Sequence, residues 1–200
     1  MKILDFKMAE DENVYPPSED SYLLIEAINS NNSRNALEIG VGSGIISLHL
    51  AKEIDTVFGC DINPYSLFLS RQNALANSIN NIYLFSSNIF SSIKTGTLFD
   101  LIVFNPPYLP VDLPPSKLID LSYHGGIDGG DHIRAFLKNL GLFLSSNGTA
   151  YLLQSSLYSL ENTTDYLENN NFRYKIKTSL KLDFENLYVL EISFFNNMNF

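Results

Sequence analysis

Hydrophobic residues along the chain fall into short runs that alternate between strand-like and helix-like patterns. The strand-like runs are apolar and are bounded by polar or turn-forming residues. They are predicted at 36–39, 56–59, 83–85, 100–104 and 149–153. The longer helix-like segments are predicted at 45–51, 64–77, 132–144 and 157–167. Strands that alternate with helices predict an α/β fold, in which a parallel sheet is covered by helices on both faces.

The C-terminal part of the pattern is different. Two β runs, 172–182 and 186–195, follow the last predicted helix, and a turn is expected near 183–186. This hairpin would add an antiparallel strand and make the sheet mixed. The stretch 29–35 is rich in asparagine and serine and is predicted to be a loop. In sheets of this kind, ligands bind at the carboxyl ends of the strands, near the point where the strand order reverses.

Length and composition favour a single domain over residues 1–200. The chain has 200 residues, of which 45% are hydrophobic and 18% charged, an ordinary globular composition. We expect a core at 35–155, an extension and helix covering the ligand site at 1–34, and a closing helix and hairpin at 156–200.

No targeting or membrane segment is expected from the sequence. No apolar run reaches the roughly 18 residues of a membrane span. The N-terminal apolar run is interrupted by Asp5 and Lys7, unlike a signal peptide. Cys60 is the only cysteine, so no internal disulfide can form. These features predict a cytoplasmic location.

The net charge of −9, with a pI near 4.7, bears on the class of partner. A protein that grips a nucleic-acid backbone usually needs a basic face, and the lysines and arginines here are scattered. The charge therefore argues against strong autonomous nucleic-acid binding, although a partner protein can supply basic residues. A negative charge also simply keeps a protein soluble.

The stretch LEIGVGSGI, residues 37–45, links a predicted strand to a predicted helix. Its glycines, Gly40, Gly42 and Gly44, have the spacing G-x-G-x-G. The dinucleotide fingerprint needs glycine where Ile45 stands, and a phosphate-binding P-loop needs Lys–Ser/Thr after its last glycine. The glycines let a ligand approach the backbone closely, and the carboxylate of Glu38 suits a cationic ligand. The other interpretation is a tight strand-to-helix turn.

Asp61 ends the next strand, 21 residues after Gly40. An acidic residue at about this separation commonly binds ribose hydroxyls. A ribose joined to a cationic amino-acid portion describes S-adenosylmethionine, and the segment around Asn88 and Ile89 follows the third strand, where adenine can be held. Alternatively, Asp61 caps the helix that begins with Pro64.

The fourth predicted strand ends in NPPY, residues 105–108. The side-chain oxygen of Asn105 and the carbonyl of Pro106 can each accept a hydrogen bond from a substrate –NH₂ group, and Tyr108 offers a flat face to a planar substrate. An amide or aromatic amine is a poor nucleophile because its lone pair is delocalised. Two acceptors can orient the nitrogen and favour a pyramidal geometry, so that catalysis is mainly positioning and electrostatics. Asn-Pro also initiates ordinary turns.

These segments together resemble the HemK-like glutamine N5-methyltransferases. The matching stretches are VYPPSEDSYLL (14–24), LEIGVGSGI (37–45), GCDIN (59–63) and FDLIVFNPPY (99–108). The resemblance is to the short eukaryotic and archaeal branch, and it implies a class I methyltransferase (Rossmann-like) fold, with a seven-stranded mixed sheet whose last strand is antiparallel. It also implies S-adenosylmethionine as cofactor and, as substrate, the glutamine of the Gly-Gly-Gln loop of a class 1 translation-termination factor. A small zinc-binding activator protein is the implied partner.

The resemblance assigns roles to individual residues. It implies that Glu38 and Gly40 belong to the first cofactor motif, with the Glu38 region near the methionine amino group, and that Asp61 holds the ribose. Gly42 is expected to be a further cofactor-binding residue. Asn88 stands where the family usually has aspartate, and Ser21 stands where the short branch often has threonine, whose hydroxyl reaches the methionine carboxylate. The implied substrate clamp is Asn105, Pro106 and Tyr108.

The segment PPSEDSYLL also has a purely structural interpretation. Ser18 can cap a helix whose first turn holds Glu19 and Asp20, with favourable charge against the helix dipole. In that case the apolar residues that follow, Tyr22, Leu23, Ile25 and Ile28, are packing residues.

Two further features carry weaker signals. The glycine-rich stretch HGGIDGGDHI (124–133) precedes a predicted helix and is expected to be a flexible loop with Asp131 as the helix cap, although the family often has a similar loop near the substrate entrance. His49, His124 and His132 do not have the spacing of metal ligands, so no metal site is predicted. His49 is expected to be a packing or surface residue.

The favoured function is therefore methylation of a glutamine side-chain amide in a termination factor. An adenine N6-methyltransferase acting on RNA or DNA is the first alternative, because adenine also offers a planar –NH₂ group. A protein lysine methyltransferase and a non-catalytic scaffold that binds S-adenosylmethionine remain open. The acidity and the N-terminal motif favour a protein substrate.

Overall fold

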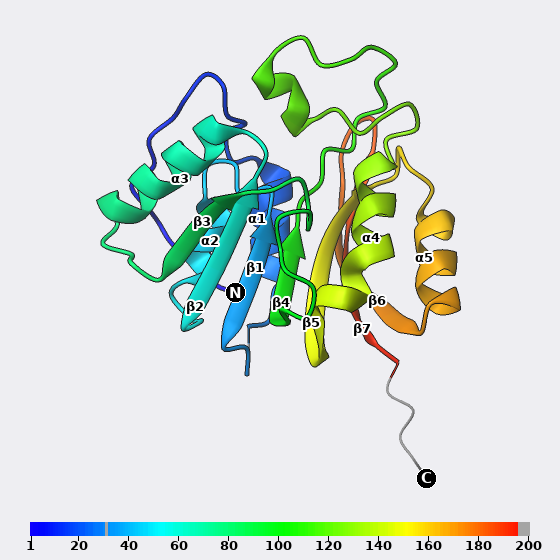
Figure 1. The fold of residues 1–200 in the computed structure, drawn as a ribbon. Helices are drawn as coiled ribbons and strands as arrows, with labels where there is room; N and C mark the ends of the chain where they lie inside the picture. Colours follow the sequence, from blue (N-terminus) through cyan, green and yellow to red (C-terminus); the bar gives the residue numbers. More distant parts are fainter. Residues whose placement is uncertain (31, 196–200) are drawn as a thin grey trace.

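The structure, a computed structural model, describes residues 1–30 and 32–195. Within this part, seven strands form one mixed sheet in the order β3-β2-β1-β4-β5-β7-β6 (Figure 1). The strands are β1 (Asn35–Ile39), β2 (Thr56–Asp61), β3 (Ile82–Ser86), β4 (Phe99–Phe104), β5 (Leu144–Ser155), β6 (Phe172–Lys181) and β7 (Asn186–Phe194). The helices are α1 (Glu19–Ala27), α2 (Ile45–Leu50), α3 (Pro64–Ala76), the 3₁₀ helix η1 (Leu118–Ser122), α4 (Asp131–Phe143) and α5 (Leu160–Asn169).

The strand directions confirm the predicted α/β class. Strands β1 to β5 pair in parallel, whereas β7 is antiparallel to both β5 and β6. The chain builds outward from β1 to β3 and then crosses back to place β4 on the other side of β1. The order therefore reverses between β1 and β4, and a ligand crevice is expected at their carboxyl ends.

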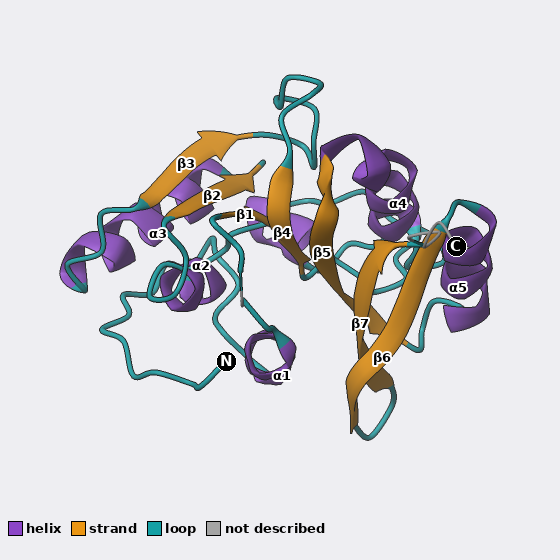
Figure 2. Cartoon of the chain, turned by 90° about the horizontal axis from the view of Figure 1, so that it is seen from below, coloured by secondary structure: helices purple, strands orange, loops and turns teal. Residues whose placement is uncertain are grey.

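Two apolar cores lie on opposite faces of the sheet. Strand residues alternate between them: Leu37 and Ile102 face α4 and α5, whereas Ala36 and Leu101 face α1 and α2. A smaller cluster joins α2 to α3 on the second face. Figure 2 shows this layering, with α4 and α5 on one side of the sheet and α1 and α2 on the other. Both faces of the central strands are buried, which explains why they are continuous apolar runs.

Two predicted boundaries were wrong. The run 149–153 is only the second half of β5, which begins at Leu144, directly after α4. Residues 145–147 are polar and mostly exposed, so the first half of the strand has no apolar signal. Helix α5 begins at Leu160 rather than 157, because the Ser159 side chain accepts a hydrogen bond from the backbone N–H of Asn162 and caps it there.

The N-terminal segment lies along α2 and α3. The backbone N–H of Leu4 donates to Nε2 of His49 (2.9 Å), and that of Ala9 donates to the Asn73 side chain (2.8 Å). His49 is fully buried and its ring edge meets Phe6, so it is a packing residue, as expected. The predicted loop 29–35 includes Asn31, which lies outside the described residues; its last residue, Asn35, begins β1.

No helix in the described part of the chain is long and apolar enough to cross a bilayer. The single cysteine, Cys60, is buried in β2, and burial raises the pKa of its thiol to about 12.

The core on the α4 side is dominated by aromatic rings. Phe136 is fully buried between Phe90 and Phe104, with ring centroids 5.7 and 5.3 Å away. We expect Phe136→Ala to lower the free energy of unfolding by about 3–5 kcal/mol, because it removes a large apolar surface and leaves a cavity. Chemical denaturation would measure this loss. Leu142→Ala, on the exposed side of the same helix, is the matched control and should change stability by less than about 0.5 kcal/mol.

Candidate active site

A cavity of about 420 Å³ opens at the carboxyl ends of β1 to β4. It lies at the predicted switch point, and its volume falls in the range of small-molecule sites. Every site residue predicted from the sequence lines it: Ser21, Glu38, Gly40, Gly42, Asp61, Asn88, Ile89, Asn105, Pro106 and Tyr108. The structure therefore brings together residues that are up to 87 positions apart in the sequence.

The glycine loop between β1 and α2 forms one wall of this cavity. Gly40 and Gly44 have φ of 70° and 85°, a left-handed backbone that favours glycine. A Cβ on Gly44 would also lie only 2.4 Å from Oγ of Ser70 in α3, so this position has no room for a side chain. The loop is thus a tight turn, as the structural interpretation predicted, and it also presents its backbone to the cavity.

Glu38 is the most deeply buried acid of the site. It is 2% exposed, and its carboxylate accepts a hydrogen bond from the Ser47 hydroxyl in α2. Burial raises the pKa of Glu38 from its ordinary 4.5 to about 8, although the Ser47 hydrogen bonds lower it and nearby Asp61 raises it further. A cation bound beside Glu38 would favour the charged form.

Asp61, the last residue of β2, is hydrogen-bonded to the glycine loop. One carboxylate oxygen accepts from the backbone N–H of Gly42 (3.0 Å) and the other from that of Asn63 (2.8 Å). Burial raises the pKa of Asp61 in spite of these hydrogen bonds. The helix cap of α3 is Asn63 rather than Asp61, because the Asn63 side chain accepts from the backbone N–H of Tyr65.

Asn88 and Ile89 form the wall beyond β3. Ile89 has φ of 52°, an unusual left-handed conformation for a branched residue. The hydroxyl of Ser87 donates to the Ile89 carbonyl (2.9 Å), and the backbone N–H of Asn88 donates to the Ser91 hydroxyl (3.2 Å). The turn that presents both residues to the cavity is therefore held by local hydrogen bonds.

Asn105 is oriented by an acid that the sequence analysis did not assign to the site. Nδ2 of Asn105 donates to Oδ2 of Asp20 in α1 (3.1 Å). Oδ1 of Asn105 is buried and has no hydrogen-bond partner among the described residues. An unpartnered buried acceptor is costly, so a ligand N–H that reached it would relieve that cost. Asp20 was interpreted only as a helix-dipole residue, although it sits inside the quoted PPSEDSYLL motif, beside Ser21.

The rest of the cavity wall comes from the long connection between β4 and α4. Pro106 is buried, and Tyr108 is half-buried against α1. Burial, with a smaller contribution from Asp20, raises the pKa of Tyr108, which therefore stays a neutral phenol. Residues 118, 121–123 and His132 complete this end of the cavity and were not predicted as site residues.

Charge in the cavity has one sign. Three carboxylate residues line it, Asp20, Glu38 and Asp61, and no lysine or arginine is among the described residues that do so. Such a lining repels phosphate and attracts cations. The absence of a dinucleotide fingerprint in the sequence agrees with this charge.

Some local predictions around the site were wrong. Ser18 stands at the cap position of α1, but its hydroxyl donates to the Glu19 carboxylate and accepts no hydrogen bond from a backbone N–H of the helix, so it does not act as a side-chain cap. Tyr22 is 37% exposed and is not a core residue. Asp131 is the first residue of α4 rather than its cap; Gly130 holds the cap position, and the Asp131 carboxylate pairs with Arg134 instead.

Comparison with known proteins decides the family. The methyltransferase small domain matches residues 13–111. A protein of Methanocaldococcus jannaschii, provisionally named a protein N5-glutamine methyltransferase, is 37% identical over 193 residues, which are 95% of this chain and 96% of that protein. The chain belongs to the HemK-like family of protein glutamine methyltransferases.

Two eukaryotic proteins of this kind are also similar. The eRF1 methyltransferase catalytic subunit mtq2 of Schizosaccharomyces pombe is 27% identical, over 93% of this chain and 91% of that one. A solved chain from the E. cuniculi Mtq2–Trm112 complex, responsible for methylation of the eRF1 translation termination factor, superposes with a TM-score of 0.72. It is 26% identical over 90% of this chain and 98% of that chain. The fold of this HemK-like chain is therefore the class I methyltransferase fold.

The buried Glu38 should make the stability of this HemK-like protein depend on pH. Its pKa is raised in the folded state, so the folded protein binds a proton more tightly than the unfolded chain between pH 4.5 and about 8. Stability should therefore fall as pH rises through this window. Thermal unfolding of the cofactor-free protein between pH 6 and 8 would measure the slope.

The variant Glu38→Gln is expected to flatten that slope, because glutamine stays neutral throughout. Glu161→Gln, on the exposed side of α5, should retain the wild-type profile. An unchanged slope in Glu38→Gln would assign the pH dependence to another group.

Proposed function

We propose that this protein binds S-adenosylmethionine and methylates the side-chain amide of the glutamine in the Gly-Gly-Gln loop of a class 1 translation-termination factor. The observation that carries the proposal is Asn105: its amide N–H is occupied by Asp20, and its buried oxygen lacks a partner among the described residues. An acceptor held in this way fits a substrate that brings an –NH₂ group.

The residues around the cavity fit the proposed cofactor. Glu38, buried and unpaired with any cation in the described structure, suits the ammonium of the methionine portion. Asp61 would hold the ribose hydroxyls, and the turn at Asn88 and Ile89 would border the adenine. Ser21 lines the cavity from α1, and its hydroxyl, which donates to Asp20 here, would meet the methionine carboxylate. The charged groups that line the cavity are all acidic, which favours a cationic sulfonium ligand over a phosphorylated one.

The protein's contribution to the chemistry would be positioning. S-adenosylmethionine, when bound, supplies an electrophilic sulfonium methyl group. Asn105 Oδ1 and the Pro106 carbonyl would each accept one N–H of the glutamine amide, so that the nitrogen lone pair turns out of conjugation with its carbonyl. Tyr108, neutral because of its burial, would pack its ring against the planar amide. The amide nitrogen would take the methyl group as the sulfonium S–C bond breaks, leaving a neutral thioether. It would then release its proton to water, so no base is needed before attack.

Protein is favoured over nucleic acid as the substrate. The chain has a net charge of −9, and the cavity itself presents only carboxylates as charged groups. Nucleic-acid phosphates would be repelled both by the net charge of the protein and by the carboxylates of the cavity. We expect the protein to work in the cytoplasm, because its proposed substrate is a translation factor.

The decisive experiment is methyl transfer to the termination factor of the same organism, read by peptide mass spectrometry. Wild type should add one methyl to the Gly-Gly-Gln glutamine. Asn105→Ala should lower kcat by about 10²–10³-fold, because it removes an acceptor that acts on the reacting nitrogen. Asn139→Ala, an asparagine on α4 that only bonds the Ala135 carbonyl of its own helix, is the matched control and should keep wild-type activity.

Parallel reactions would contain RNA, DNA and histone-tail peptides. Methylated adenine without methylated glutamine would move the assignment to the adenine N6 class, and methylated lysine would move it to the lysine class. Cofactor binding without any transfer, even with an activator protein present, would favour the scaffold interpretation.

We also propose that the protein assembles with a small zinc-binding activator. Strand β3 is an edge of the sheet, and Tyr83 on it is 56% exposed. Helix α3 packs beside β3 on one face of the sheet (Figure 1). It exposes Phe68 (60%) and Leu75 (67%), two turns apart on one side of the helix, whereas Tyr83 lies on the other face of the sheet, against Phe58. An apolar surface next to an open strand edge is typical of a protein-binding site. The Trm112 subunit of the similar solved complex indicates the kind of occupant.

Leu75→Lys and Tyr83→Glu should weaken co-purification with the organism's own relative of that subunit by at least about tenfold in Kd, because each buries a charge in an apolar contact. Leu142→Lys, equally apolar and exposed on α4, which packs on β5 and not on β3, is the control and should not change it. Metal analysis of the purified complex would test for zinc. Unchanged binding in both variants would exclude α3 and the β3 edge as the activator-binding site.

A further inference from the structure

The glycine-rich segment 124–131 is paired with the chain that follows the NPPY clamp. The backbone N–H of Leu109 donates to the Tyr123 carbonyl (2.9 Å), and that of Gly125 donates to the Leu109 carbonyl (2.8 Å). A third bond runs from the Val111 N–H to the Gly126 carbonyl (2.9 Å). The bridge between Leu109 and His124 is parallel. The segment is therefore a short ladder, not the flexible loop expected from its composition.

Two glycines of this segment lie directly against the backbone of Tyr108. A Cβ on Gly129, whose φ is 77°, would lie 2.5 Å from the Tyr108 carbonyl oxygen. A Cβ on Gly125 would lie 2.8 Å from the Tyr108 carbonyl carbon and 2.9 Å from the Cα of Gly129. The atoms that would collide are backbone atoms, which cannot rotate away as a side chain can. Any side chain at either position must therefore displace Tyr108 or the segment itself.

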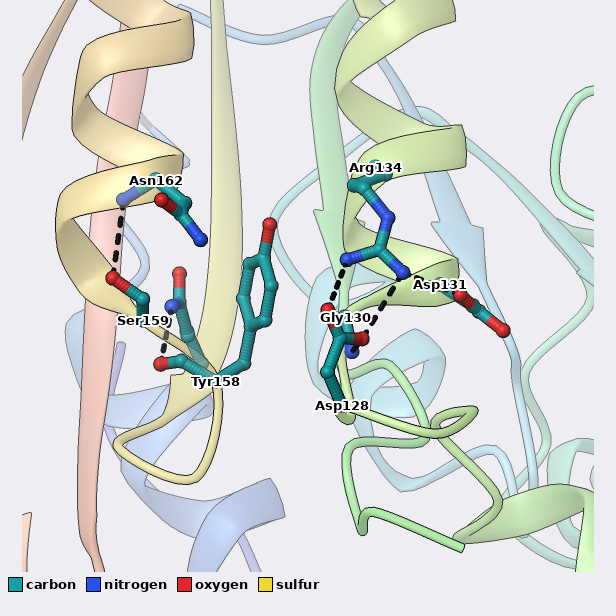
Figure 3. Close-up of polar contacts among 8 residues, drawn as sticks. Asp128, Gly130, Asp131, Arg134, Tyr158, Ser159 and Asn162 are labelled. Carbon is teal, nitrogen blue, oxygen red and sulfur yellow. Dashed lines mark hydrogen bonds and ion pairs between the residues drawn. The ribbon is translucent and has the colours of Figure 1, made fainter. Parts of the chain in front are cut away.

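A polar cluster attaches the other end of the segment to α4 (Figure 3). Arg134 makes two hydrogen bonds to the Asp128 carboxylate, of 2.7 and 3.0 Å, and pairs with Asp131. Asp128 also accepts from the Gly130 N–H (3.0 Å), and the guanidinium lies 5.4 Å from the ring centroid of Tyr158. Half-exposed ion pairs contribute little stability on their own. A two-pronged contact does, however, fix the geometry of the turn.

We propose that residues 124–131 are a positioning element that holds Tyr108 and the adjoining clamp in register, with Arg134 anchoring the element to α4. The proposal rests on the proposed function in so far as the clamp is the catalytic part. In this proposal, glycine is required at 125 and 129 because the two backbones are in contact there. The positioning element, residues 124–131, is called the brace below. The brace contacts the clamp at one end of the cavity, whereas Glu38 and Asp61 belong to walls that the brace does not contact.

The brace should therefore affect turnover and leave cofactor binding unchanged. In Gly129→Ala and Gly125→Ala we expect kcat to fall by about 10–100-fold, the usual consequence of misplacing reacting groups by a fraction of an ångström to an ångström. The Kd for S-adenosylmethionine should stay within about twofold of wild type. Hydrogen exchange within residues 105–111 should become faster at the amides of Leu109 and Val111, because these two N–H groups donate to the facing chain and those bonds weaken.

Gly96→Ala is the matched control. Gly96 also has a positive φ, of 92°, but a Cβ there would meet no atom within 4 Å. This variant therefore has the same backbone strain as Gly129→Ala without the contact to Tyr108. It should keep wild-type kcat and wild-type exchange at 105–111.

Arg134→Lys provides a second variant in case an alanine at 125 or 129 prevents folding. Lysine keeps the charge but loses the two-pronged contact, so kcat should fall by about two- to fivefold at unchanged melting temperature. A purely structural role would instead lower the melting temperature and weaken cofactor binding along with kcat, and that result would overturn the proposal.

All variants would be measured as full chains, with the activator protein present, by calorimetry for S-adenosylmethionine, mass spectrometry for methyl transfer, and hydrogen exchange. Wild-type kcat and exchange in Gly129→Ala would overturn the brace. If wild type fails to methylate the termination factor, the proposed function fails. The exchange comparison between Gly129→Ala and Gly96→Ala then still decides whether the segment holds residues 105–111.

Discussion

The hydrogen bond from Asn105 to Asp20 joins two parts of the chain on which the candidate site depends. Asp20 belongs to the helix that precedes the sheet, and Asn105 follows the fourth strand, 85 positions later. The bond uses the donor end of the amide and so determines which end is left for a ligand. Without the helix, the asparagine would be free to rotate. The N-terminal segment is thus part of the site, although it contributes no strand to the sheet.

The electrostatics of the cavity are unfavourable until a ligand arrives. Glu38 is removed from water and compensated only by the hydroxyl and the backbone N–H of Ser47, and the pKa of Asp61 is also raised by burial. Neutral hydrophobic residues at these positions would cost less in the ligand-free protein. Under the proposed function, this cost would be recovered when a cationic ligand binds. Stability would then be exchanged for affinity at this site, a common relation between the two.

The sequence predicted the residues at the strand ends of the candidate site better than the residues that surround and orient them. Gly40, Asp61 and Asn105 could be found because each directly follows an apolar strand, and the carboxyl ends of parallel strands meet at one edge. Asp20 could not, because a carboxylate in the first turn of a helix has an adequate local explanation, and His132 could not, because it has no ligand-like spacing with the other histidines. Their contribution depends on which strand end lies opposite, and that is fixed only by tertiary packing.

The same limit applies to the glycine-rich segment and to β5. Composition identifies glycines as permissive, but it does not distinguish a mobile loop from a close contact between two backbones. Likewise, the polar residues 145–147 of β5 lie at a register shift between the Leu144 and Thr149 pairings with β4, which periodicity cannot detect. Predictions from pattern were right where side chains carry the signal, and wrong where the backbone does.

The burial of Cys60 makes this protein a convenient starting point for labelling. Its thiol is enclosed within the sheet, and the raised pKa keeps it protonated and unreactive near neutral pH. A cysteine introduced on the surface would therefore be the only thiol available to a maleimide probe. Placed at the exposed Leu113, in the long connection after the clamp, such a probe would report on how that connection moves as substrate enters and product leaves.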